Sequence, residues 1–292
     1  MTFFALLTKE LRLRLRRERT IWVIIVYILL MGLLGWFYIS RLSAYNNNYS
    51  GYGLGQLGKQ LYYLLSMVQL FLILFITPAF TSTAINGEKE RQTFDLLLCS
   101  RLSALSLISG KLVAGLLNAL LLIAASVPLF SFVFFFGGVS PSQVLLALLV
   151  FIVTTIMVGT FGLFCSAMLS RPAVSTAVSY LAGIIWMVMP LIMTFILFAA
   201  GGYRGQNQAL LYIWNPVVAL FSTYPDGTGV TYTIGSQHVP IWLTYALISP
   251  VATILFFFLG VLVVKPNRFI RFPRQEKKRI KQVPTPKTTA TA

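Results

Sequence analysis

The sequence predicts an all-α integral membrane protein with six transmembrane helices, an amphipathic interfacial helix at its N-terminus, and a short external cap of helix and hairpin before the last span. Of its 292 residues, 57% are hydrophobic and only 10% are charged, whereas a soluble domain has roughly 25% charged residues. The mean hydropathy is +0.81, and so few charges cannot solvate the surface of a soluble protein of this size. The composition therefore excludes a soluble globular protein and a disordered chain.

Residues 1–19 precede the first span and contain six Lys and Arg residues. Drawn as a helix, the segment has an apolar stripe of Phe4, Leu7, Leu11 and Leu15, with basic side chains on the far side. This pattern is typical of a helix that lies in the membrane interface. The alternative is an ordinary basic flank of the first span.

Residues 20–264 form the predicted transmembrane domain, with six apolar stretches of at least about 20 residues each, enough to cross a ~30 Å hydrocarbon core as helix. They are too long for strands and lack alternation. The predicted spans are 20–40, 61–85, 112–136, 144–169, 174–200 and 242–264. None contains Asp, Glu, Lys, Arg or His. Because ion-coupled carriers usually need such groups within the membrane, energy for transport is expected from outside this domain.

Four spans contain one proline each, namely Pro78, Pro128, Pro190 and Pro250. Proline removes a backbone hydrogen bond and kinks a helix, so these spans are either hinged or simply show the usual frequency of proline in membrane helices. Gln69 and Asn118 are the strongest polar groups at mid-membrane depth, and we expect them to form hydrogen bonds between helices.

The distribution of basic residues predicts the topology. Of the 23 Lys and Arg residues, 20 lie on one side of the predicted spans, and only Arg41, Lys59 and Arg204 lie on the other. The positive-inside rule then places both termini in the cytoplasm of a multi-pass protein of the plasma (inner) membrane. The formal net charge of +16 is thus mainly a topology signal, and we expect no nucleic-acid partner.

The tail, residues 265–292, is predicted to be a disordered, basic, cytoplasmic segment because it has little to bury. It either contacts anionic lipid head groups or acts only as a stop-transfer anchor.

The few reactive side chains argue against an enzyme. The two cysteines, Cys99 and Cys165, form no metal-binding motif and are expected to be reduced thiols on the cytoplasmic side. The single histidine, His238, has only Asp226 as an acidic neighbour in the external segment, and no nucleophile-elbow motif is present. We therefore expect no catalytic residue, cofactor or metal ion.

Residues 53–59, GLGQLGK, fit the first seven positions of a phosphate-binding loop. Gln60 replaces the Ser or Thr that would bind magnesium, and no apolar strand precedes the motif. We interpret it as a flexible glycine-rich loop.

The most informative segment is the predicted cytoplasmic loop, residues 86–111. Gly87 interrupts the membrane helix, and alternating charges follow it. Thr93 is suited to cap a short apolar helix over residues 94–98. Because an apolar helical tip in the cytoplasm needs a groove on a partner, we expect this loop to dock on another protein.

This loop resembles that of the ATP-binding-cassette type-2 permease family, in which an E-x-E-R-G-T-x-E-x-L-L-like sequence precedes a small turn and a G-K pair. The matching residues are Glu88, Glu90, Arg91, Thr93, Leu97, Leu98, Gly110 and Lys111. The chain departs from the pattern at Gln92, where glycine is usual, at Asp95, which replaces glutamate, and at residues 99–101, which replace a Ser/Thr-Pro turn.

The predicted external cap, residues 201–241, also carries the resemblance. Its Asn215-Pro216 pair is similar to an Asn-Pro in the family. Residues 230–234 alternate like a strand, and Gly235-Ser236 is suited to close a hairpin. The resemblance implies that the segment caps the exit pathway, and the alternative is a structured plug without a gating role.

The resemblance implies a permease half of an ATP-driven exporter. Two six-span subunits would pair, as a homodimer or a heterodimer, and a separate cytoplasmic ATPase subunit would hydrolyse ATP. The ATPase-coupling residues would be Glu88, Glu90, Arg91, Thr93, Phe94, Asp95, Leu97 and Leu98. The apolar spans favour a lipophilic substrate. The alternative is a membrane anchor or assembly subunit that binds an ATPase complex without transporting anything.

Overall fold

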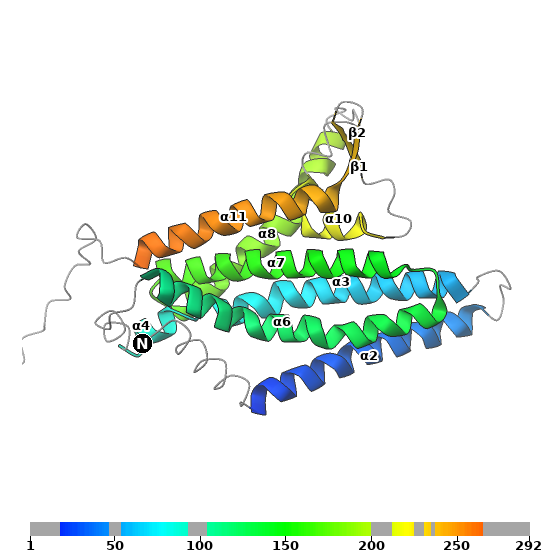
Figure 1. Cartoon of the computed structure of the whole chain (residues 1–292), viewed down its shortest axis with the longest axis horizontal. Helices are drawn as coiled ribbons and strands as arrows, with labels where there is room; N and C mark the ends of the chain where they lie inside the picture. Colours follow the sequence, from blue (N-terminus) through cyan, green and yellow to red (C-terminus); the bar gives the residue numbers. More distant parts are fainter. Residues whose placement is uncertain are drawn as a thin grey trace, which may run out of the picture.

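The computed structural model shows a bundle of long helices that run side by side along the longest axis (Figure 1). It describes residues 18–46, 54–92, 104–199, 212–224, 231–234 and 237–264. Three segments discussed above lie outside this part of the chain. They are the predicted interfacial helix (1–19, apart from its last two residues), the loop residues 93–103 and the tail 265–292.

Within the described part, six helices are long and apolar enough to cross a membrane. They are α2 (Glu18–Asn46), α3 (Leu54–Thr81), α6 (Ala104–Phe136), α7 (Pro141–Met168), α8 (Pro172–Ala199) and α11 (Ile241–Val264). Two short helices, α4 (Asn86–Glu90) and α10 (Pro216–Phe221), and two strands, β1 (Thr231–Ile234) and β2 (Gln237–Pro240), complete the described elements. The predicted all-α membrane fold with six spans is confirmed.

The strands form the hairpin that the sequence predicts. They pair in antiparallel register from Thr231 opposite Pro240 to Ile234 opposite Gln237. In Figure 1 this hairpin and α4 lie at opposite ends of the bundle, which we call the hairpin end and the α4 end.

Helix α7 lies at the centre of the bundle, because it packs against α3, α6, α8 and α11. Small residues permit this close packing. A Cβ atom at Gly162 of α7 would collide with the hydroxyl of Thr81 on α3, and one at Gly115 of α6 would lie 2.8 Å from the methyl group of the same threonine. The C-terminal turn of α3 is therefore held between α6 and α7.

The glycine-rich segment near Lys59 is not a loop, so that interpretation is wrong. Residues from Leu54 onward belong to α3. A Cβ atom at Gly58 would collide with the carbonyl oxygen of Gly137, and one at Gly138 would collide with that of Gly55. The glycines thus permit close backbone contact between the start of α3 and the turn that joins α6 to α7, where Gly137 and Gly138 have φ of 77° and 82°.

The polar groups within the membrane partly follow the prediction. The hydroxyl of Tyr27 on α2 donates to Oε1 of Gln69 on α3, so Gln69 does bond across helices. Oδ1 of Asn118 has no hydrogen-bond partner among the described residues. All four prolines lie inside helices.

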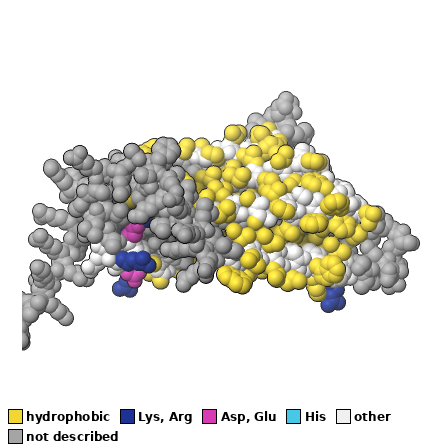
Figure 2. Space-filling model, turned by 60° about the horizontal axis from the view of Figure 1, so that its bottom comes forward, with side chains coloured by type: hydrophobic (Ala, Val, Ile, Leu, Met, Phe, Trp, Pro, Cys, Tyr) yellow, Lys and Arg dark blue, Asp and Glu magenta, His cyan; other side chains and the backbone are white. Residues whose placement is uncertain are grey.

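Hydrophobic and charged side chains occupy different parts of the surface, as expected for a membrane protein. Figure 2 shows a broad hydrophobic surface over the middle of the bundle, with charged side chains near its ends. Glu90 and Arg91 are exposed at the α4 end, whereas Arg41 lies at the hairpin end with its guanidinium 5.1 Å from the ring centroid of Phe37.

Candidate functional site

The candidate site is the segment that leaves α3 at the α4 end. Helix α3 contains Pro78 and ends at Thr81, whose hydroxyl donates to the backbone oxygen of Thr77 at 3.0 Å. A four-residue turn follows, and α4 then begins at Asn86. The change of direction brings the backbone of residues 82–91 against the ends of other membrane helices.

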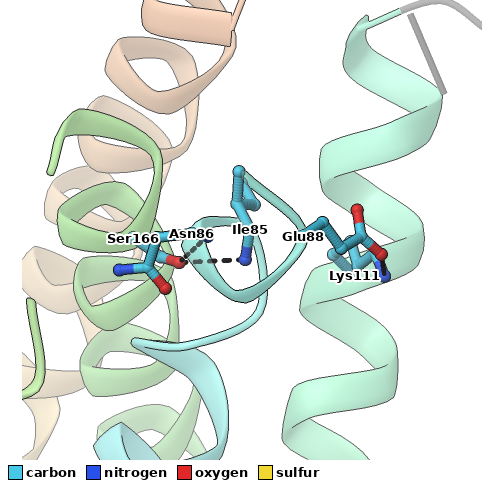
Figure 3. A network of polar contacts seen from close by, with 5 residues as sticks. All are labelled: Ile85, Asn86, Glu88, Lys111 and Ser166. Carbon is cyan, nitrogen blue, oxygen red and sulfur yellow. Dashed lines mark hydrogen bonds and ion pairs between the residues drawn. The ribbon is translucent and has the colours of Figure 1, made fainter. Parts of the chain in front are cut away.

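Ser166 in the last turn of α7 holds the start of α4. Its Oγ accepts the backbone N–H of Ile85 at 2.9 Å and that of Asn86 at 3.1 Å. Figure 3 shows both bonds converging on this oxygen. Two N–H groups at a helix start that lack partners within the helix are thus satisfied by one side chain of another helix.

The preceding turn is bonded to α8. The hydroxyl of Ser175 donates to the backbone oxygen of Ser82 at 2.8 Å. The hydroxyls of Ser82 and Thr176 lie 2.9 Å apart in a second hydrogen bond. The segment after α3 is therefore attached to α7 and α8 by short polar contacts.

Charged residues attach the segment to α6 and to the end of α7. Glu88 forms an ion pair with Lys111 of α6 (Figure 3). The ammonium of Lys89 donates to the backbone oxygen of Ala167 at 2.5 Å, a favourable place for a cation because helix C-termini carry partial negative charge. Burial lowers the pKa of Lys89 from its usual value.

The predicted coupling residues divide into three groups. Glu88 is partly buried and directed to α6, whereas Glu90 and Arg91 are exposed. The remaining five, Thr93, Phe94, Asp95, Leu97 and Leu98, lie outside the described residues. Ser166, Ser175, Thr176 and Lys89 were not among the predicted residues. For the first three, the sequence signal is a hydroxyl group near the end of an apolar helix, and for Lys89 it is a cation within the predicted loop.

Gln92 has a φ of 58°, the only positive value among the described non-glycine residues. Its N–H is bonded to the backbone oxygen of Lys89 at 3.2 Å, which closes α4. This left-handed conformation favours glycine, so Gln92 occupies a backbone position at which a side chain is unfavourable.

Asn86 combines complete burial with an unsatisfied amide. The side chain has an exposed fraction of 0%, and neither its nitrogen nor its oxygen has a partner within the described part of the chain. A buried amide without partners is costly. Asn86 therefore marks the start of α4 as a place where the packing is not optimised for stability alone.

A second structured segment enters the bundle from the hairpin end. Asn215 caps α10, and Pro216 follows as the first helical residue. Tyr224 stacks on Tyr63 of α3 with 4.4 Å between ring centroids, and its hydroxyl lies 2.7 Å from that of Ser66. The predicted cap, residues 201–241, thus includes a segment that packs between membrane helices.

Comparison with protein families identifies the chain. A family model described as "ABC-2 family transporter protein" matches residues 41–263. The chain belongs to this ABC-2 family. The match extends from the end of α2 to the last turn of α11 and so includes both the α4 segment and α10. A comparison with curated protein sequences gave no significant match.

Family membership gives the general function of the fold. The chain is a multi-pass membrane component of the ABC permease type, and ABC-2 proteins associate with an ABC ATPase. In this family the membrane component is generally not itself catalytic.

Proposed function

We propose that this ABC-2 protein is the permease half of an ATP-driven exporter in the plasma membrane. Two six-span subunits pair, as a homodimer or a heterodimer, and both termini of each lie in the cytoplasm. A separate ABC ATPase docks on the loop of residues 86–111 and drives export of a lipophilic substrate.

The observation that carries this proposal is the attachment of the α4 segment to three membrane helices. It is bonded to α7 through Ser166, to α8 through Ser175 and to α6 through the Glu88–Lys111 ion pair. A displacement of this segment by a partner therefore acts on three helices together, which is what coupling of ATP hydrolysis to transport requires.

The exposed charges support a docking role for the same segment. Glu90 and Arg91 are accessible at the α4 end, where they favour the correct partner and register more than they add affinity. Phe94, Leu97 and Leu98, which follow in the sequence, supply the apolar anchor in this proposal.

The proposed orientation is tested by labelling single cysteines in a Cys99→Ser, Cys165→Ala background. A membrane-impermeant maleimide should label Arg41→Cys on intact cells and should label Arg91→Cys only after the membrane is permeabilised. The reverse pattern would place the α4 end outside the cell and would refute the docking of a cytoplasmic ATPase there.

Transport itself is tested in inside-out vesicles that contain the chain and its ATPase. We expect ATP-dependent accumulation of at least one member of a panel of neutral, anionic and cationic lipophilic fluorophores. An ATPase variant that binds but does not hydrolyse ATP is the control. If the complex assembles and hydrolyses ATP but moves none of the probes, the alternative of a non-transporting anchor is favoured.

A further inference from the structure

The segment of residues 82–92, which contains α4, has a single large apolar side chain, that of Ile85. Ile85 is buried in a cluster that includes Ile108 of α6, Leu163 of α7 and Val261 of α11. Helices α3, α6 and α7 each bury several apolar side chains. Compared with these helices, the segment therefore gains little stability from hydrophobic burial.

The residue next to this anchor, Asn86, opposes its burial. Asn86 has an exposed fraction of 0%, and neither polar atom of its side chain has a partner within the described residues. Both atoms would be bonded to water if the segment left the bundle, so the packed position loses hydrogen bonds that the exposed position makes. This cost is similar in size to the gain from burying an isoleucine side chain. The packed position of the segment therefore depends on its polar contacts.

These polar contacts lie near the ends of two membrane helices. Ser166, which accepts two N–H groups of the segment, lies two residues before the end of α7, and Ser175, which donates to its backbone, is the fourth residue of α8. Glu90 and Arg91, at the far end of α4, are exposed. A short element with few buried apolar contacts and an exposed end opens at a lower free-energy cost than the helices around it.

We propose that residues 82–92 form a strap with two positions, and that the buried side-chain amide of Asn86 keeps the packed position only slightly more stable than the open one. In the packed position, which the structure describes, the strap is bonded to Ser166 and Ser175. In the open position these bonds are broken and water hydrates the amide, while α6, α7 and α8 stay folded. The two positions exchange within one copy of the chain, so the proposal does not depend on coupling to an ATPase.

Asn86→Leu tests the amide directly, because leucine has a similar branched shape with two methyl groups in place of the oxygen and the nitrogen. The measurement is hydrogen–deuterium exchange of the full-length chain in lipid nanodiscs without an ATPase, corrected for intrinsic exchange rates. Removing two unsatisfied atoms should slow backbone exchange of the peptide 82–92 at least about tenfold. Asn86→Ala removes the amide without adding bulk, and it should act in the same direction even if leucine prevents folding.

The control separates this effect from helix propensity. Leucine favours a helix more than asparagine does, but replacing glycine by alanine gains more propensity still. Gly87→Ala is the matched variant, because a Cβ atom at Gly87 meets no other atom within 4 Å. It should slow exchange of the same peptide by no more than about fivefold. Slowing in Asn86→Leu that does not exceed the slowing in Gly87→Ala would assign the effect to propensity and would overturn the proposal.

The other outcomes are equally decisive. Unchanged or faster exchange in both Asn86→Leu and Asn86→Ala would show that the amide stabilises the packed position, for example through a buried water molecule, and would overturn the proposal. Peptides of α7 and α8 should exchange at the same rate in every variant, because these helices stay folded when the strap opens. If their exchange changes together with that of residues 82–92, the whole bundle opens and the strap is not a separate unit.

Discussion

The side-chain nitrogen of Asn215 donates a hydrogen bond of 2.9 Å to the backbone oxygen of Met187, three residues before Pro190 in α8. Oδ1 of the same asparagine accepts the N–H of Val217 at 2.8 Å and thereby caps α10. Because proline lacks an N–H, α8 loses one backbone hydrogen bond near this position. Asn215 thus joins the start of α10 to the weakened turn of α8.

Replacement of Asn215 should therefore disturb two elements at once. Asn215→Ala removes the cap, a loss of about 0.5–2 kcal/mol, and leaves the Met187 oxygen without this donor, a further loss of about 1–3 kcal/mol. Asn215→Asp keeps a cap but has no donor for Met187. We expect both variants to lower the midpoint of thermal unfolding in detergent micelles.

The control for this change is Ser131→Ala. The exposed hydroxyl of Ser131 bonds only to the backbone oxygen of Val127 in its own helix, so its loss should leave the midpoint almost unchanged. If Asn215→Asp unfolds at the same temperature as the unmodified chain, the bond to Met187 does not stabilise α8.

The glycine contact between α3 and the α6–α7 turn gives a second prediction. Gly58→Ala would place a Cβ atom against the carbonyl oxygen of Gly137, and such overpacking typically costs 1–3 kcal/mol. Gly32→Ala, which has open space around the new atom, should be neutral or stabilising by up to about 1 kcal/mol. Gly58→Ala should therefore lower the midpoint of thermal unfolding and Gly32→Ala should not, and equal shifts in the two variants would contradict the close contact.

The contact of Ser166 with α4 gives a third prediction. Ser166→Ala removes the acceptor of two backbone N–H groups, those of Ile85 and Asn86. We expect faster amide hydrogen exchange in the peptide that spans residues 82–92. Ser109→Ala is the control, because Ser109 lies near the same end and its hydroxyl bonds only to the backbone oxygen of Ser106 in its own helix. Unchanged exchange in Ser166→Ala would show that the start of α4 is held by other contacts.

The six spans could be predicted because the thickness of the bilayer fixes the length of an apolar helix, whereas the contacts between helices could not. The face of α7 that packs on α3 depends on where Gly162 meets Thr81, and no local pattern reveals that pairing. The same limit explains the error at Gly58, where a glycine that permits close backbone contact was interpreted as a glycine of a flexible loop.

For the candidate site, as for the fold, the sequence indicated the position of a segment but not its contacts. The sequence indicated the position of the α4 segment, because Gly87 and alternating charges interrupt an apolar run. Asn215 followed by Pro216 is a favoured helix start, but this pair was interpreted only as part of the family resemblance, and α10 was not predicted. The partners of these residues, Ser166 and Met187, are distant in the sequence and could be found only in three dimensions.

Gln92 gives a fourth prediction. Its φ of 58° is strained for a residue with a side chain, by roughly 1–2 kcal/mol. Gln92→Gly should relieve this strain and slow the amide exchange of α4, whereas Gln92→Val, with a β-branched side chain, should accelerate it. Equal exchange in both variants would show that Gln92 does not keep its left-handed conformation in the membrane-embedded protein.

The last prediction concerns the proposed contact with the ATPase. Phe94 and Leu97 follow the exposed Glu90 and Arg91 and are two of the apolar residues of the predicted tip. Truncating a buried aromatic anchor at a hot spot often costs about 2 kcal/mol or more, which corresponds to a roughly thirtyfold loss of affinity. Phe94→Ala should therefore weaken co-purification with the ATPase and reduce transport per ATP hydrolysed.

The matched control is Phe135→Ala, which truncates an aromatic side chain that is 83% exposed near the hairpin end of α6. It should leave both ATPase binding and transport unchanged. Phe94→Ala should still insert into the membrane at normal levels, because the residue lies outside the six spans. If Phe94 instead lies only on the lipid surface, its replacement would change neither readout. A Phe94→Ala, Leu97→Ala double variant that retains full ATPase binding and full transport would therefore exclude a docking role for this loop.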